Sequence, residues 1–457
     1  MTSPRTLLSA LLAAFFALTL SLTSPSPATA QSADGAASAD AGSSLELLRS
    51  AERRAGAPIY LQRVLSQLYS VDSIYRSMQG PWSQESVVLG DALHHQGLKE
   101  GSAAELLWVV GYRAAMVAAD GESARSQEFM CHSNLDLNAA DHRSRFGAQK
   151  VTDGRLFTLS QGQYTIDLPE GFGIPLLSDE PLSLTTQVLN LNLPEPRGLD
   201  VRHRVEIQFV RDADLKRPMQ ALFPQGIYGL ATLEDQPVVF GREASPTSSA
   251  GHLLGAAASI AKPEEGSDSA GHHGGDHSSH GSHEGHGDAH GGAHGGAADV
   301  EAMMAAGATC MVGQNAATHE YQDRLGRRFT GHWVVQPGRE VNRTLVTDIL
   351  TLPFDTRVHY IAVHLHPFAE SLELRNLTTG KTVFKSRVRP ADAGIGIEHV
   401  EYFSSVEGVE LFREHEYEMV SIYENSSGEP QDSMAVMYLY LLDREYQRPA
   451  ELTVAGR

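Results

Sequence analysis

Short runs of alternating apolar and polar residues make up most of the chain from about Leu106 onward. They are separated by Gly, Pro, Asp and Asn residues, which favour turns. Alternation with a period of two is the pattern of strands that are buried on one face. Many short strands with turn signals between them are typical of a sandwich or a jelly roll. We therefore predict a mainly β protein with two tandem jelly-roll or β-sandwich domains.

A helix-like pattern precedes these runs. Apolar residues recur there at spacings of three and four: Leu61, Val64, Leu65 and Leu68. Such spacings match one face of an amphipathic helix, so we predict a helical segment over residues 46–100. Residues 31–45 are rich in Ala, Ser, Gly and Asp, which predicts a flexible leader.

Residues 245–298 interrupt the strand pattern with Gly, Ala, Ser, Asp and His and have few large apolar side chains. Because such a segment has little to bury, we predict a disordered insertion between an N-terminal β domain at 101–244 and a C-terminal β domain at 299–447. Eight histidines lie between His272 and His294. Imidazole binds Cu(II), Ni(II) and Zn(II), so the tract either captures copper or is a linker that binds metal adventitiously.

The first thirty residues have the pattern of a secretory signal peptide. Arg5 supplies a positive start, and a mostly apolar run extends from Leu7 to Leu22. Small residues then lead to a cleavage site near Ala30. The run is short for a spanning helix. We therefore predict that residues 1–30 are removed, that the protein is exported (periplasmic or secreted), and that no stable membrane insertion follows cleavage.

The composition narrows the class of protein. The 457 residues are 41% hydrophobic, which suits globular domains, and carry a formal net charge of −20. No basic surplus is available to neutralise phosphates, so nucleic acid is excluded as a partner. The chain has two cysteines, Cys131 and Cys310. In an oxidising compartment they predict one disulfide, and metal binding by Cys131 is the alternative.

The candidate metal ligands lie on two predicted strands of the C-terminal domain. Residues 358–366 alternate like a strand, so His364 and His366 share one face and can aim both imidazoles at one metal. A second predicted strand begins near Met434. Two imidazoles and a thioether form a soft, mixed ligand set that suits copper cycling through the cuprous state. For Met434, core packing is the alternative.

The segment from Pro337 to Met434 resembles the C-terminal domain of the copper type II, ascorbate-dependent monooxygenases, the family of peptidylglycine alpha-hydroxylating monooxygenase and dopamine beta-monooxygenase. In that family a Pro-Pro-Gly turn precedes a strand ending in His-Thr-His, and an Asp-Glu-Met motif later supplies a methionine ligand. Here a Pro-Gly turn, a His-Leu-His strand end and an Asp-Ser-Met motif stand in the same order. The resemblance implies one copper held by His364, His366 and Met434, with Tyr438 orienting the substrate or the oxygen species.

The N-terminal half resembles the family's first domain more faintly. The Cys131-His132 pair stands where the family has two adjacent histidines, and leucine or asparagine stands where a third completes the electron-transfer copper site. Because only His132 of that site is retained, a second copper is doubtful. The alternative is a rebuilt second site in which His332 or Cys310 joins this pair.

Two positions of the family's substrate pocket also differ. In the peptidylglycine enzyme, an arginine two residues before the first histidine and an asparagine two residues after the methionine hold the substrate carboxylate. Here these positions are Ala362 and Val436, and neither side chain can donate a hydrogen bond. The resemblance therefore implies a small substrate that is not a peptidylglycine.

Three functions remain open at this point. The first is a copper-dependent monooxygenase that hydroxylates a C–H bond of a small substrate, using dioxygen and an external electron donor such as ascorbate. The second is a copper-binding or copper-handling protein that keeps the mononuclear site without hydroxylase activity, which the incomplete second site and the His-rich tract favour. The third is a β-sandwich binding module with incidental histidines.

Overall fold

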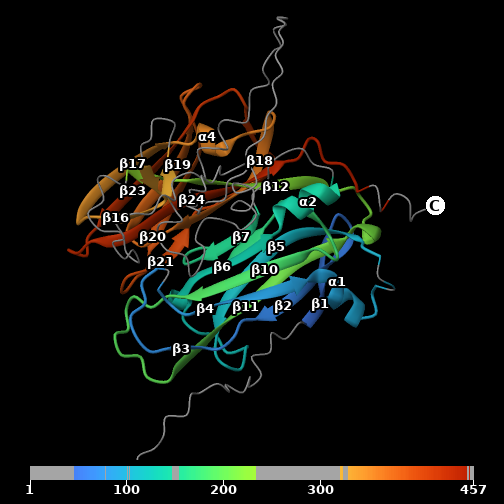
Figure 1. The fold of residues 1–457 in the computed structure, drawn as a ribbon, viewed down its shortest axis with the longest axis horizontal. Helices are drawn as coiled ribbons and strands as arrows, with labels where there is room; N and C mark the ends of the chain where they lie inside the picture. Colours follow the sequence, from blue (N-terminus) through green and yellow to red (C-terminus); the bar gives the residue numbers. More distant parts are fainter. Residues whose placement is uncertain are drawn as a thin grey trace, which may run out of the picture. The chain divides into compact units, whose positions relative to one another are not determined.

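The structure is a computed structural model, and the residues that it describes are 46–77, 79–99, 101, 103–146, 154–232, 320–322, 328–449 and 452 (Figure 1). All of them belong to one compact unit. The predicted signal peptide, the flexible leader and the His-rich insertion lie outside the described residues, and so does Cys310. The prediction of a mainly β, sandwich-like fold is confirmed.

Two sheets that share one apolar core make up the first half of the described chain. The strands of the first sheet are β1 (Glu46–Arg54), β2 (Ala57–Leu65), β3 (Tyr69–Val71), β5 (Leu106–Val117), β8 (Thr165–Asp167), β9 (Phe172–Leu177) and β11 (Leu199–Arg211). Their order is β1-β2-β11-β5-β9, with β3 on β11 and β8 on β5. The second sheet has, in spatial order, β4 (Trp82–Val88), β10 (Pro181–Val188), β6 (Met130–Leu137) and β7 (Arg155–Ser160).

The second half also has two sheets. One continues the first sheet through the pairing of β9 with β12 (Gln220–Tyr228), so that twelve strands form one sheet. Its strands in the second half are, in spatial order, β12, β24 (Gln431–Leu442), β18 (Thr356–Leu365) and β22 (Phe403–Leu411), and β16 (His332–Val335) also pairs with β24. The other has β17 (Gly338–Leu345), β23 (Tyr417–Asn425), β19 (Ala369–Asn376), β20 (Lys381–Pro390) and β21 (Ile397–Val400). A small sheet contains β13 (Ala231–Thr232), β15 (Arg328–Thr330) and β14 (Glu320–Gln322).

Helices contribute little to the described part of the chain. They are α1 (Leu89–His95), α2 (Ala139–Phe146), α4 (Thr347–Leu350) and the 3-10 turns η1 (Gln127–Phe129) and η2 (Asp212–Asp214). Within these described residues, no helix is long and apolar enough to cross a membrane.

The prediction of a helical segment over 46–100 is wrong. This region forms β1 to β4, and α1 is its one helix among the residues described. In β2 the side chains of Tyr60, Gln62 and Val64 are buried, whereas Leu61 and Leu65 are only partly covered. The strand pairs with β1 on one side and β11 on the other. The three-and-four spacing of leucines was therefore coincidental, because long-range pairing overrides a weak local preference.

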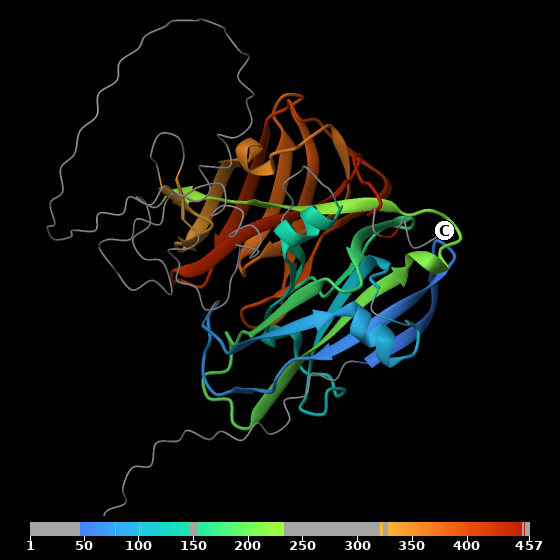
Figure 2. The same ribbon diagram turned by 45° about the vertical axis from the view of Figure 1, so that its right-hand side comes forward.

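Strand β12 joins the two halves. It precedes the His-rich insertion, so its residues were assigned to the N-terminal β domain at 101–244, but it pairs along its length with β24 of the second half (Figure 2). Two residues of β12 also pair in parallel with β9. The first sandwich in turn takes in β1 to β4. In space, the boundary between the halves therefore falls before β12 and not at the insertion.

Strands β18 and β24 are buried on both faces. Ile361 and Met437 point into the core of the second sandwich. Ala362, Val436 and Tyr438 join the core cluster of the first half instead. Burial on both sides explains the nearly continuous apolar run of β24. It also means that every second residue of these strands is presented to the first half of the chain, and the candidate site uses these positions.

Candidate metal centre

The two histidines of the His-Leu-His motif lie at the end of β18. His364 belongs to the strand and His366 directly follows it, and both are buried. Their ring centroids are 5.3 Å apart and the rings are nearly perpendicular. Since Ala362 on the same side of β18 packs into the core of the first half, the imidazoles are presented to that half.

Met434 lies near the start of the neighbouring strand. Val436 pairs with His364, so Met434, two residues earlier, is on the same face of the sheet. Its side chain is buried, and the hydroxyl of Tyr423 donates a hydrogen bond to its backbone carbonyl. On the other side of β24, Met434 pairs with His332 of β16. The structure thus brings His364, His366 and Met434 together on one face, with His332 beside them.

A carboxylate stands between two of these histidines. Asp432 Oδ1 is 2.9 Å from His332 Nε2, and Asp432 Oδ2 is 3.2 Å from His366 Nδ1. The side chains of all three residues are at most 8% exposed. The three ligand atoms lie within 4.8 Å of one another, which is compatible with one metal ion. Sequence reasoning used Asp432 only as part of a motif and named His332 only as an alternative ligand.

The electrostatics of Asp432 depend on its neighbours. Burial alone raises the pKa of this carboxyl, but the imidazoles of His332 and His366 lower it by more, so the pKa lies below its ordinary value. The carboxylate is therefore ionised at neutral pH. It can either orient the imidazoles or bind a cation itself.

His364 is oriented by the first half of the chain. Its Nδ1 is 2.9 Å from the hydroxyl oxygen of Ser160, the last residue of β7. The side-chain oxygen of Gln163, in the turn after Ser160, accepts a hydrogen bond from the backbone NH of Val363. Burial, followed by the nearby histidines, holds the pKa of His364 well below its ordinary value. This imidazole is therefore neutral at physiological pH, as a metal ligand must be.

His132 lies on the same face of the β6–β7 pair as Ser160, with which it is in register. The neighbouring Ser133 instead bonds to Tyr112 inside the first sandwich, so His132 faces the second half. It is fully buried, and Asn134 contacts its Nδ1 at 3.2 Å. Burial, Arg155 and nearby histidines lower its pKa to about 3. Among the residues described, its Nε2 has no hydrogen-bond partner.

The other buried histidine of the first half, His203, does not join this group. It lies on β11 among residues that form the core of the first sandwich. Its Nε2 is 3.2 Å from the carbonyl oxygen of Gln187, and its ring packs against Tyr69. Since Gln187 pairs with His132, the strand β10 backbone lies between the two imidazoles. A second centre built from His132 and His203 is therefore not supported by the geometry.

A small cleft of about 40 Å³ opens at the centre. Met130, Cys131 and Leu189 line it from the first half, and His364, His366 and Asp432 line it from the second. The volume is enough for a metal-bound water molecule or two but not for an organic substrate of ordinary size. Cys131 is buried here beside His132. Its predicted disulfide with Cys310 stays a prediction, since Cys310 is outside the described residues.

Tyr438 lies on the same face of β24 as Met434 but four residues further along, about 13 Å away at 3.3–3.4 Å per residue. It is buried in the core cluster between the two halves and pairs with Ala362. Within the described part of the chain, it does not belong to the lining of the cleft. Its predicted role in orienting a substrate stays a prediction.

Comparisons with known proteins add no assignment. No family model matches the chain, and no curated protein matches it. A solved structure titled "Crystal Structure of the STIV MCP" matches over 86% of this chain and 99% of its own, with 7% sequence identity and a TM-score of 0.24. At this score the likeness carries no argument about fold or function. The conclusions about this protein therefore rest on its own residues.

Proposed function

We propose that the protein is an exported copper-dependent monooxygenase that hydroxylates a C–H bond of a small substrate, with dioxygen and an external reductant such as ascorbate. The observation that carries the proposal is the shared face of His364, His366 and Met434, of which the two histidines line a small cleft between the two halves. Two imidazoles and a thioether suit copper that alternates between Cu(I) and Cu(II). Copper bound there would supply the activation of dioxygen and the one-electron chemistry.

The chain's own residues would set the geometry of this copper position. With Nδ1 of His364 hydrogen-bonded to Ser160, its Nε2 is the nitrogen that would hold the metal. Asp432 contacts Nδ1 of His366 and would orient that ring in the same way. Apolar side chains such as Met130 and Leu189 would limit the access of water.

The proposed class of substrate follows from two positions at which this chain differs from the peptidylglycine enzyme. Ala362 and Val436 are fully buried and offer no hydrogen-bond donor from their side chains. A carboxylate-bearing peptide would lose its anchor there, so we propose a more apolar substrate. Opening of the contact between the halves would be needed to admit it, because the cleft as observed is too small.

The same small cleft favours a second candidate. A copper-binding or copper-handling protein needs a buried ligand set but no room for a substrate. The first half contributes His132 to the centre, whereas His203 faces away, which supports one copper per chain rather than two. A single copper with slow, unproductive oxidation of reductant would favour this function over hydroxylation.

The test uses the full chain with the eight histidines between His272 and His294 replaced by serine, which we call the tract-silent chain. Loaded with copper and freed of excess, it should retain one copper. The double variant His364→Ala, His366→Ala should lose this copper, and Met434→Ala should weaken Cu(I) binding at least tenfold. Met437→Ala is the matched control, because Met437 is equally buried in β24 but points into the opposite core.

Activity is then tested with ascorbate, labelled dioxygen and a panel of small apolar compounds. Incorporation of one labelled oxygen atom into a product would support the monooxygenase. Oxidation of ascorbate without a product would support the copper-handling protein. Copper retained in the double histidine variant would rule out both.

A further inference from the structure

The group of His332, His366 and Asp432 has a geometry of its own that the copper proposal does not require. These residues come from three adjacent places in one sheet: β16, the end of β18, and β24 between them. Paired strands hold side chains with little freedom, so the group is built on rigid elements. Trp333 and Ser433 reinforce this pairing through a further hydrogen bond.

The distances are close to those of a metal site. In a tetrahedral zinc site with ligands about 2.0–2.1 Å from the ion, neighbouring ligand atoms are about 3.3 Å apart. The two imidazole-to-carboxylate contacts measure 2.9 and 3.2 Å, and all three ligand atoms lie within 4.8 Å of one another. The two imidazole-to-carboxylate contacts would therefore need to lengthen by only a few tenths of an ångström to hold an ion.

The chemistry of the neighbours separates this group from an ordinary ion pair. Both basic side chains that contact the carboxylate of Asp432 are imidazoles, among the residues described. Asp432 Oδ2 is buried, and no hydrogen bond reaches it within that part of the chain, although His366 Nδ1 is 3.2 Å away. A contact this close between Nδ1 and Oδ2, without the alignment of a hydrogen bond, is consistent with the lone pairs of both atoms pointing at one ion.

We propose that His332, His366 and Asp432 bind one divalent transition-metal ion. Its ligands are Nε2 of His332, Nδ1 of His366 and a carboxylate oxygen of Asp432. His366 and Asp432 also line the cleft, so a fourth position faces it and can hold water. Three protein ligands and one open position are the arrangement of catalytic rather than structural zinc sites.

This position differs from the proposed copper position in its donors. It uses nitrogen and oxygen, which suit Zn(II) or another borderline divalent ion, whereas the copper set includes a thioether. The two share only His366, through different nitrogens of its ring. The inference therefore stands whether or not the copper proposal holds.

Zinc binding to the metal-free tract-silent chain tests the proposal, with Zn(II) as the probe. One zinc should bind per chain. Both Asp432→Asn and His332→Ala should weaken its affinity by more than about 100-fold, because each removes a ligand rather than an outer contact. Met434→Ala should leave zinc affinity within threefold. His359→Ala is the matched control, since His359 is another buried histidine of β18 that bonds to Ser405 instead.

X-ray absorption at the zinc edge of the unmutated protein decides the ligands without relying on the folding of any variant. We expect two imidazoles, oxygen scatterers and no sulfur. A sulfur scatterer bound directly to the ion would place Cys131 or Met434 among the zinc ligands and overturn the proposal. Undiminished zinc binding in Asp432→Asn, or failure of the unmutated chain to bind zinc, would overturn it as well. Loss of Cu(I) binding in Met434→Ala with zinc retained would show that the thioether belongs to the copper position alone.

Discussion

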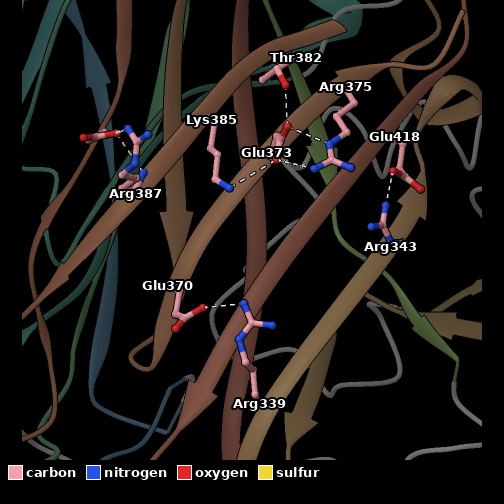
Figure 3. A network of polar contacts seen from close by, with 10 residues as sticks. Arg339, Arg343, Glu370, Glu373, Arg375, Thr382, Lys385, Arg387 and Glu418 are labelled. Carbon is pink, nitrogen blue, oxygen red and sulfur yellow. Dashed lines mark hydrogen bonds and ion pairs between the residues drawn. The ribbon is translucent and has the colours of Figure 1, made fainter. Parts of the chain in front are cut away.

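The second half of the molecule carries two polar networks that differ in their cationic partners. On the five-stranded sheet, carboxylates pair with arginine and lysine, as in Arg339–Glu370 and Arg343–Glu418 (Figure 3). In the buried centre, Asp432 pairs with two imidazoles. Arginine and lysine stay protonated and cannot ligate metal, whereas an imidazole can lose its proton and bind one. The arginines and lysines of the surface network therefore contribute only charge. In the buried network, the imidazoles can lose a proton and bind a metal ion in its place.

The carboxylates of the two networks also respond to different causes. The guanidinium of Arg375, which binds Glu373 through two hydrogen bonds, lowers the pKa of Glu373 to about 2. Burial opposes this lowering for both carboxyls, but it is the largest single effect on the pKa of Asp432, and the two imidazoles together outweigh it. Its ionised form therefore depends on the continued presence of its histidines or of a metal. Solvent screens the surface pairs, whereas buried charges must be matched by their immediate neighbours.

The largest stability effect is expected where a buried permanent charge loses its partner. Arg155 is almost fully buried between the halves and pairs with Asp136. Replacement Asp136→Ala should lower the free energy of unfolding by about 3–5 kcal/mol, because the guanidinium would remain buried without that carboxylate. Chemical denaturation checks this. A loss below about 1 kcal/mol would mean that Arg155 is solvated or paired elsewhere, and the contrast with the surface network would fail.

An effect of intermediate size on the free energy of unfolding is expected when the pH is lowered. Burial lowers the pKa of His203 to about 4, and burial with Arg155 lowers that of His132 to about 3, whereas both are near 6.5 when unfolded. The unfolded state thus binds more protons below pH 6.5, so stability falls as the pH decreases toward the folded-state values. Together the two histidines should cost the metal-free protein about 2 kcal/mol between pH 6.5 and 5.5.

Denaturation of the metal-free tract-silent chain at several pH values measures this dependence. His132→Asn should remove about 1 kcal/mol of it between pH 6.5 and 5.5, because His203 lies on the other side of β10 and keeps its own contribution. A pH dependence that His132→Asn leaves unchanged would show that His132 is already protonated or exposed in the folded protein.

The smallest effect is expected on the surface. Arg339 and Glu370 are about half exposed. Replacement Arg339→Ala should change the free energy of unfolding by less than about 0.5 kcal/mol, and added salt should reduce even that. Paired denaturation curves at low and high ionic strength measure both quantities. A larger effect, or one that persists in high salt, would indicate that these ion pairs stabilise the fold and are not screened by solvent.

The local periodicity of the sequence was sufficient for part of the fold and of the site. A period of two predicts strands, and it predicts that His364 and His366 share a face, because side-chain direction along a strand depends only on neighbouring residues. The same reasoning failed for residues 46–100. There the spacing of a few leucines was local, whereas the pairing of β2 with β11 was not.

The sequence by itself determined the residue types available for metal binding and the strand character of the segments that carry them. Only the tertiary structure decided which of them meet. Trp333 and Ser433 are a hundred residues apart in the chain and hydrogen-bonded in space, and this pairing places His332 against Met434 and Asp432. Strand pairing and the packing of one half on the other also separate His132 from His203 and bury Tyr438 away from the cleft. Such contacts depend on the whole folded chain, so no local pattern of residues encodes them.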